Sequence, residues 1–168
     1  MSKTVLGVFR DTSQAEKAVD ELERRGVKKE DVSIVARENL VRSSGQGDGS
    51  SSQDATTMDF GEDLSGGIST GGAIGGIAGL LAGVGALAIP GVGPIIAAGP
   101  IAAALSGAVT GGIAGGLIDW GIPEDVGERY EQRVKEGKIV AIVRANDKKV
   151  SEAASIFRRH GAEEVETH

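Results

Sequence analysis

The glycines and histidines that could do chemistry in this chain each lack the partners that the chemistry needs. A phosphate-binding loop requires glycines that follow a strand and open a helix, with a lysine or an acidic residue downstream. Gly91 and Gly93 have no third glycine at the required place and no lysine within reach, so we interpret them as part of a turn. His160 and His168 have no second ligand at a spacing that suits a metal ion. These residues therefore predict neither a cofactor site nor a metal site.

The carboxylates and hydroxyls predict no catalytic arrangement either. Glu164 and Glu166 fall on one face of a short predicted strand, and we interpret them and Glu163 as solvated edge charges. Serines and threonines are plentiful between residues 43 and 63, but no histidine and aspartate are arranged to activate one as a nucleophile. We therefore expect that the protein is not an enzyme.

The composition disfavours several further classes of protein. The chain has 168 residues, a net charge of −6 and no cysteine, so it has neither a disulfide framework nor a thiolate metal site. Aromatic residues make up 3% of it and no basic face stands out, which argues against nucleic-acid binding. The first residues lack the apolar run and cleavage site of a signal peptide, and we expect a cytoplasmic protein.

Residues near the N-terminus predict a strand, a helix and a second strand. Thr4 to Phe9 and Val32 to Ala36 are rich in β-branched and apolar residues, and the segment between them has helical periodicity. Ser13 and Glu16 have the spacing of a capping box, and Gly26 supplies a C-terminal stop. The apolar face expected for this helix consists of Ala15, Ala18, Val19 and Leu22.

The same order of elements returns near the C-terminus. Ile139 to Val143 and a short segment about 164–166 predict strands, and Asn146 or Asp147 caps the helix between them. Pro123 to Glu136 predicts one more helix, with proline in its first turn and acidic residues after it. The apolar face of the helix between the strands consists of Val150, Ala153, Ala154, Ile156 and Phe157.

Between these two units, residues 64–118 contain no Asp, Glu, Lys, Arg or His, and glycines recur in them at four-residue spacing. This spacing is typical of a glycine zipper, because it places the glycines in one stripe on a helix and lets another helix approach closely. The predicted helix-helix contacts are Gly67, Gly71, Gly75, Gly79 and Gly83 in a first arm, and Gly107, Gly111 and Gly115 in a second.

The uncharged stretch predicts a helical hairpin with arms at about 64–89 and 101–118, joined by a turn region that contains Pro90, Pro94 and Pro100. The second arm would be about 27 Å long, near the roughly 30 Å of a bilayer's hydrocarbon core. Phe60 and Trp120 flank the stretch like an interfacial aromatic pair. One ridge of the second arm consists of Ile101, Leu105, Val109, Ile113 and Leu117.

Two interpretations of the hairpin remain open. The hairpin inserts in or lies on a lipid bilayer as an oligomer, or hairpins from several subunits form a water-soluble bundle. A disordered linker is disfavoured, because such linkers do not keep two registers of aliphatic residues and glycines.

Together these patterns predict an α+β protein: a ferredoxin-like split βαβ antiparallel sheet with helices on one face, interrupted by a glycine-zipper α-helical hairpin. The expected division of the chain is 1–42 for the first half, 43–63 for a flexible acidic linker, 64–120 for the hairpin and 121–168 for a helix and the second half.

Two segments resemble a known family. VLGVFRDTSQAEKAVDELERRGVKKEDVSIVA and GIPEDVGERYEQRVKEGKIVAIVRA are similar to the two hallmark segments of the general stress protein 17M-like domain family. Many members of this family also carry a glycine-rich apolar insert between the two halves. The resemblance implies a stress-associated, non-enzymatic protein of bacteria or archaea, and it implies no active-site residues.

We therefore expect a non-enzymatic stress protein without cofactors that forms a homo-oligomer or associates with membrane through the hairpin. The alternative is a ligand- or signal-sensing module that uses the open face of the ferredoxin-like sheet.

Overall fold

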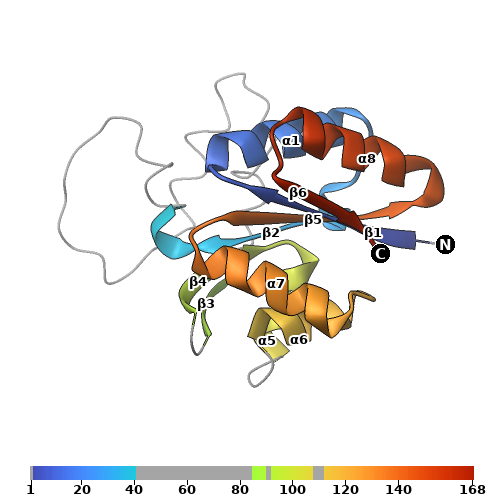
Figure 1. Ribbon diagram of the computed structural model, residues 1–168. Coiled ribbons are helices and arrows are strands. Elements are labelled where there is room, and N and C mark those ends of the chain that lie inside the picture. The colour runs from blue at the N-terminus through green and yellow to red at the C-terminus, as the bar shows by residue number, and fades with distance from the viewer. Residues whose placement is uncertain (1, 41–84, 90–91, 108–111) are drawn as a thin grey trace, which may run out of the picture.

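A computed structural model of the chain describes residues 2–40, 85–89, 92–107 and 112–168 (Figure 1). The fold is α+β, with one antiparallel sheet of six strands in the order β3-β4-β2-β5-β1-β6 and helices on both of its faces. The elements are β1 (Ser2–Phe9), α1 (Thr12–Arg24), the 3₁₀ turn η1 (Lys29–Asp31), β2 (Val32–Arg37), β3 (Gly85–Ile89), β4 (Gly93–Ala98), α5 (Pro100–Gly107), α6 (Gly112–Ile118), α7 (Glu124–Lys135), β5 (Ile139–Asn146), α8 (Asp147–Arg159) and β6 (Glu164–Thr167).

The helices α1 and α8 cover one face of the sheet, above it in Figure 1. The apolar faces expected for both helices are buried here, which confirms the helical periodicity. Phe9 of β1 and Phe157 of α8 meet edge to face with ring centroids 5.5 Å apart. A Cβ atom at Gly7 would lie 2.6 Å from the Phe157 ring, so only glycine lets α8 approach β1 this closely.

The caps of these two helices are partly as predicted. Asn146 caps α8, since its side chain accepts a hydrogen bond from the N–H of Lys149 at 3.1 Å. The capping box expected for Ser13 and Glu16 is wrong, because α1 already begins at Thr12. Its cap is Asp11, whose carboxylate accepts from the N–H of Gln14 at 2.9 Å.

The helices α5, α6 and α7 cover the opposite face, which was expected to be open. Successive side chains of β1 lie on opposite faces of the sheet, so that Val5 and Phe9 are in one core and Leu6 and Val8 are in the other. The run Ile139–Val143 has no polar residue on either side, which is the pattern of a strand buried on both faces. The expectation of helices on one face only is therefore wrong.

The predicted helical hairpin is also wrong where the structure describes it. Residues 85–89 and 93–98 form β3 and β4, and β4 pairs with β2, so this segment extends the sheet. Pairing with β2 on one side and β3 on the other satisfies the backbone groups of β4, so tertiary contacts decide its structure. Residues 64–84 of the first arm and the linker 43–63 lie outside the described residues.

The second arm forms two short helices, α5 and α6, in place of one helix over 101–118. Gly112 at the start of α6 has a φ of +60°, which a continuous α-helix does not accommodate. The predicted ridge is nevertheless buried at Ile101, Leu105, Ile113 and Leu117, and it packs in the same core as the sheet. Val109 lies outside the described residues.

Within the described ranges, no helix combines the length and the apolar character that crossing a membrane requires.

Candidate functional site

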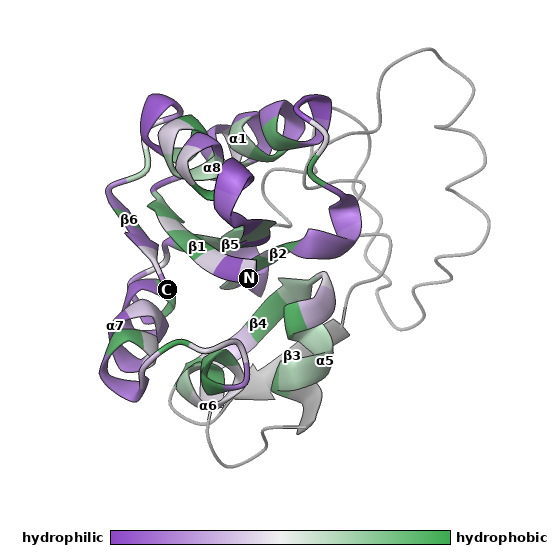
Figure 2. Ribbon diagram, turned by 90° about the vertical axis from the view of Figure 1, so that its right-hand side faces the viewer, coloured by the Kyte–Doolittle hydropathy of each residue, from purple (hydrophilic) through white to green (hydrophobic). Residues whose placement is uncertain are grey.

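The two edge strands of the sheet differ in charge. In the described residues β3 pairs only with β4, at one end of the strand order. Neither β3 nor any residue up to Ile118 carries a charged side chain. Figure 2 shows strong purple, which marks hydrophilic residues, on α1, α7 and α8, and only green to pale colours on α5 and α6. The β3 edge, defined here as residues 85–89, is therefore an uncharged sheet edge.

The β3 edge is held in place by the turns of β4. Gly93 begins β4 with a φ of +88°, and Gly99 ends it with a φ of +83°. A Cβ atom at Gly99 would lie 2.2 Å from the carbonyl oxygen of Val32, so this turn touches the β2 backbone directly. The N–H of Ile101 donates to the buried Ser33 hydroxyl at 3.3 Å, which satisfies a donor in the first turn of α5.

Pro94 identifies the backbone groups of β3 that point away from β4. In an antiparallel ladder, opposed residues alternate between pairs that exchange both hydrogen bonds and pairs that exchange none. Pro94 has no N–H, so its pair with Ala88 is of the second kind. The N–H and C=O groups of Ala86 and Ala88 therefore point outward. The pairs that exchange bonds are Gly85 with Ala97, Leu87 with Ile95, and Ile89 with Gly93.

The β6 edge, residues 164–167, is charged, and its carboxylates are paired with arginines of α7. Arg129 of α7 donates to Glu166 at 2.7 Å, and Arg133 of α7 donates to Glu164. Just before the strand, Lys138 and Arg10 both donate to Glu163, and these hydrogen bonds, Lys138 first, lower the pKa of that carboxyl. The carboxylates lie at the sheet edge as expected, but they form ion pairs and are partly buried, so the expectation that they are solvated is wrong.

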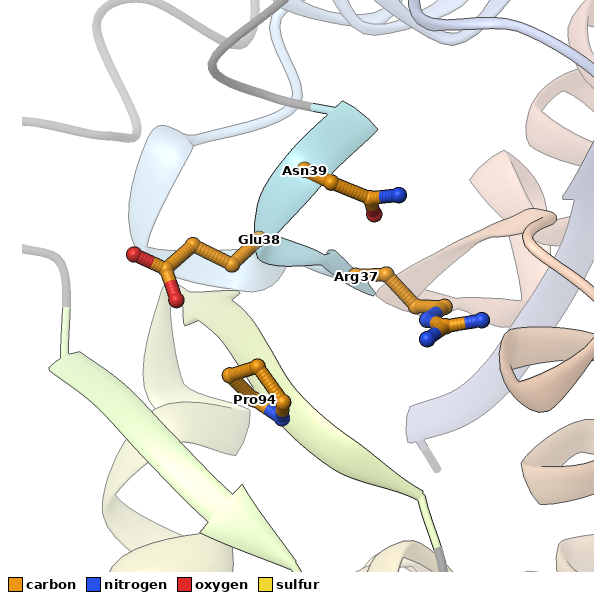
Figure 3. Close-up of a pocket in the computed structure, with 4 residues that line it drawn as sticks. All are labelled: Arg37, Glu38, Asn39 and Pro94. Carbon is orange, nitrogen blue, oxygen red and sulfur yellow. The ribbon is translucent and has the colours of Figure 1, made fainter.

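A pocket of about 310 Å³ lies beside the β3–β4 hairpin (Figure 3), lined by Arg37, Glu38, Asn39 and Pro94. In Figure 3 the Arg37 guanidinium and the Glu38 carboxylate point in opposite directions. The guanidinium donates to the backbone oxygen of Lys135 at the C-terminus of α7, at 3.3 Å. Because the polar groups diverge, this pocket offers no converging set for binding a ligand.

The predicted zipper glycines fall mainly in the part of the sequence that the structure does not describe. Gly67, Gly71, Gly75, Gly79, Gly83 and Gly111 lie outside the described residues, as does Phe60. Gly107 is the last residue of α5, and Gly115 is partly buried in α6.

Close helix approach at glycine does occur, at two positions that the zipper register did not include. A Cβ atom at Gly116 of α6 would lie 2.7 Å from Leu105 Cδ2, and one at Gly127 of α7 would lie 3.0 Å from Ala114 Cα. The buried face of α7 (Val126, Gly127, Tyr130 and Val134) has helical spacing and could have indicated Gly127. Gly116 is adjacent to the predicted Gly115, so the register differs by one residue.

Trp120, expected at a membrane interface, lies partly buried against the core of α5, α6 and α7. The Arg144 guanidinium lies 4.4 Å from its ring centroid, a cation–π contact. The hydroxyl of Thr4 donates to the Trp120 backbone oxygen at 3.2 Å. These contacts join the turn after α6 to the centre of the sheet.

Each histidine is partly buried and lies within hydrogen-bond distance of a glutamate. His160 Nε2 lies 2.6 Å from Glu21 Oε2, and this hydrogen bond is the main cause of the lowered pKa of Glu21. His168 Nε2 lies 3.2 Å from Glu166 Oε2. The described part of the chain contains no cluster of three His, Asp or Glu residues that could hold a metal ion.

Comparison of the chain with protein-family models, with curated proteins and with solved structures gives no match.

Proposed function

We propose that this protein is a non-enzymatic, stress-associated protein that self-assembles into a homo-oligomer, with a ferredoxin-like domain as its scaffold. The observation that carries the proposal is the β3 edge. A sheet edge without charged residues presents unpaired N–H and C=O groups to another chain, and natural proteins usually protect such edges. The β6 edge of the same sheet has that protection in Glu164 and Glu166.

The strand order supports the scaffold part of the proposal. The order β2-β5-β1-β6, with α1 and α8 on one face, is the order of a ferredoxin-like sheet. The β3–β4 hairpin extends this sheet beyond β2.

The stress setting rests on the resemblance to the general stress protein 17M-like domain family. It is tested by measuring the abundance of the protein in its native cells before and after heat, salt or starvation stress. An abundance that does not change under any of them would contradict this part of the proposal.

Self-assembly is favoured over membrane association by the burial of the second arm. Its aliphatic ridge packs against the sheet, and among the residues whose burial the structure describes, Ile118, 48% exposed, is the large hydrophobic residue at the surface. The surface formed by the described second arm therefore offers little apolar area to a bilayer.

The experiment is a mass measurement by light scattering on the full chain, without detergent and over a wide range of concentration. We expect at least twice the chain mass of 17.1 kDa, and a mass that persists near 1 M salt, because uncharged contacts are not screened. A mass of 17.1 kDa at every concentration would contradict self-assembly. Sedimentation of such a monomer with phosphatidylcholine vesicles would favour membrane association instead.

A further inference from the structure

We infer that β3 pairs with β3 of a second copy of this chain, antiparallel and about a two-fold axis, so that the two sheets become continuous. The inference rests on the proposed self-assembly and names the surface that produces it.

The outward-facing backbone groups of β3 fit this pairing in the register in which all five residues of the two strands overlap. Ala86 and Ala88 carry the outward N–H and C=O groups, as the position of Pro94 requires. A two-fold axis through Leu87 places Ala86 of one copy opposite Ala88 of the other, and the reverse. Both residues then exchange both hydrogen bonds, so the pairing satisfies all four outward groups of each copy while all five residues overlap.

The lack of charge at the β3 edge is compatible with pairing to a second copy of the same strand. A two-fold axis brings each residue near its own copy, so a charged strand would meet like charge. The sequence from Leu64 to Ile118 contains no charge, so the β3 edge has no such repulsion. The same operation at the β6 edge would bring together Glu164 and Glu166 of both copies.

The absence of native cysteine makes the pairing directly testable. In the inferred register Leu87 faces Leu87 of the second copy as a non-bonded pair, with Cα atoms about 4.5 Å apart, within the range that a disulfide spans. A single Leu87→Cys substitution in the full chain therefore creates a thiol that can form a disulfide only with another copy. We expect mild oxidation to give a covalent dimer on a non-reducing gel.

The matched control places one thiol at the opposite edge. Thr4 and His168 exchange both backbone hydrogen bonds, at 2.7 and 2.9 Å, so the adjacent Thr167 has an outward N–H like that of Ala86. Thr167→Cys should remain monomeric on the same gel. Equal cross-linking of the two variants would overturn the inference, since it would reflect random collision.

Proline substitution provides a second measurement that does not depend on a thiol. Ala86→Pro and Ala88→Pro, made singly, each remove one outward donor and no bond to β4, so the hairpin keeps its ladder. Each should weaken self-association by about tenfold or more, because a symmetric dimer loses two hydrogen bonds. Thr167→Pro removes an outward donor of β6 and should leave association unchanged.

The outcomes separate the inference from the proposed function. A wild-type chain that is monomeric contradicts the proposed function and, with it, the β3 pairing. A wild-type oligomer in which Leu87→Cys forms no disulfide and both proline variants associate normally overturns the β3 pairing alone. This second result would place the contact elsewhere, or β3 beside another segment of its own chain.

Discussion

At one edge of the sheet, β6 carries Glu164 and Glu166, both paired with arginines of α7. At the other edge, β3 carries no charge and follows directly on an uncharged sequence. Charged side chains on an edge strand discourage pairing with another chain, because they would be desolvated or would meet like charge. The difference is that, among the described residues, β6 has charge protection against pairing with another chain and β3 has none.

The largest effect is expected at Gly99, which supports the β3 edge through the turn from β4 to α5. Gly99→Ala adds a Cβ atom 2.2 Å from the Val32 carbonyl oxygen at a φ of +83°, and we expect a loss of about 3 kcal/mol or more in unfolding free energy. Urea unfolding measures this loss, and self-association should fall with it. Gly121→Ala is the control, because Gly121 has a φ of +76° with no atom within 4 Å, and it should lose only about 1 kcal/mol. Equal losses would show that backbone strain alone matters at Gly99.

The next effect concerns the contacts of α6 with α7 and with α5. Gly127→Ala would press on the α6 backbone at Ala114, whereas Gly116→Ala would press on the side-chain end of the buried Leu105. We expect Gly127→Ala to cost about 1–3 kcal/mol of unfolding free energy, and Gly116→Ala to cost less, because a side chain can rotate away. Thermal unfolding of each variant shows which substitution costs more stability. A larger loss for Gly116→Ala than for Gly127→Ala would contradict the packing of α6 against α7.

How much of this could be predicted from the sequence differs between the two halves of the sheet. Residues such as Leu22 and Phe157 lie on faces of clear helical period, so the helices α1 and α8 and the strands next to them were predicted. The charges of β6 were predicted as well, because they fall on a short strand after a helix stop at Gly161.

The β3–β4 hairpin could not be predicted from the same patterns. Glycine and alanine at four-residue spacing suit a helix stripe, but a run such as Ile95 to Ala98 suits a strand equally well. The choice depends on tertiary contacts, namely the pairing of β4 with β2 and the contact of Gly99 with Val32. The outward groups of β3 depend on the register of Pro94, which sequence periodicity does not reveal.

A third prediction concerns a variant in which the two edge strands no longer differ in charge. Replacing both Glu164 and Glu166 by Thr gives β6 an uncharged edge and removes its ion pairs with α7. We expect a loss of about 1 kcal/mol in unfolding free energy, since surface ion pairs contribute little, together with higher-order association. Light scattering against the wild-type chain measures the mass. An unchanged mass would show that charge does not protect this edge.

The smallest effect concerns pH. The pKa of Glu163 is lowered by hydrogen bonds from Lys138 and then Arg10, so the stability that it contributes is present above its ordinary pKa. That stability is lost as the pH falls through the lowered pKa. Glu163→Gln should therefore reduce the dependence of unfolding free energy on pH in the acid range and leave the mass of the oligomer unchanged. Identical acid unfolding curves for the variant and wild type would contradict this contribution.

Amide hydrogen exchange of the full wild-type chain, followed by NMR at high and at low concentration, tests the β3 pairing most directly. We expect the outward amides of Ala86 and Ala88 to be protected at high concentration and to lose that protection on dilution, while the outward amide of Thr167 exchanges rapidly at both. Rapid exchange of Ala86 and Ala88 at every concentration, or protection that dilution does not change, would contradict pairing with a second copy.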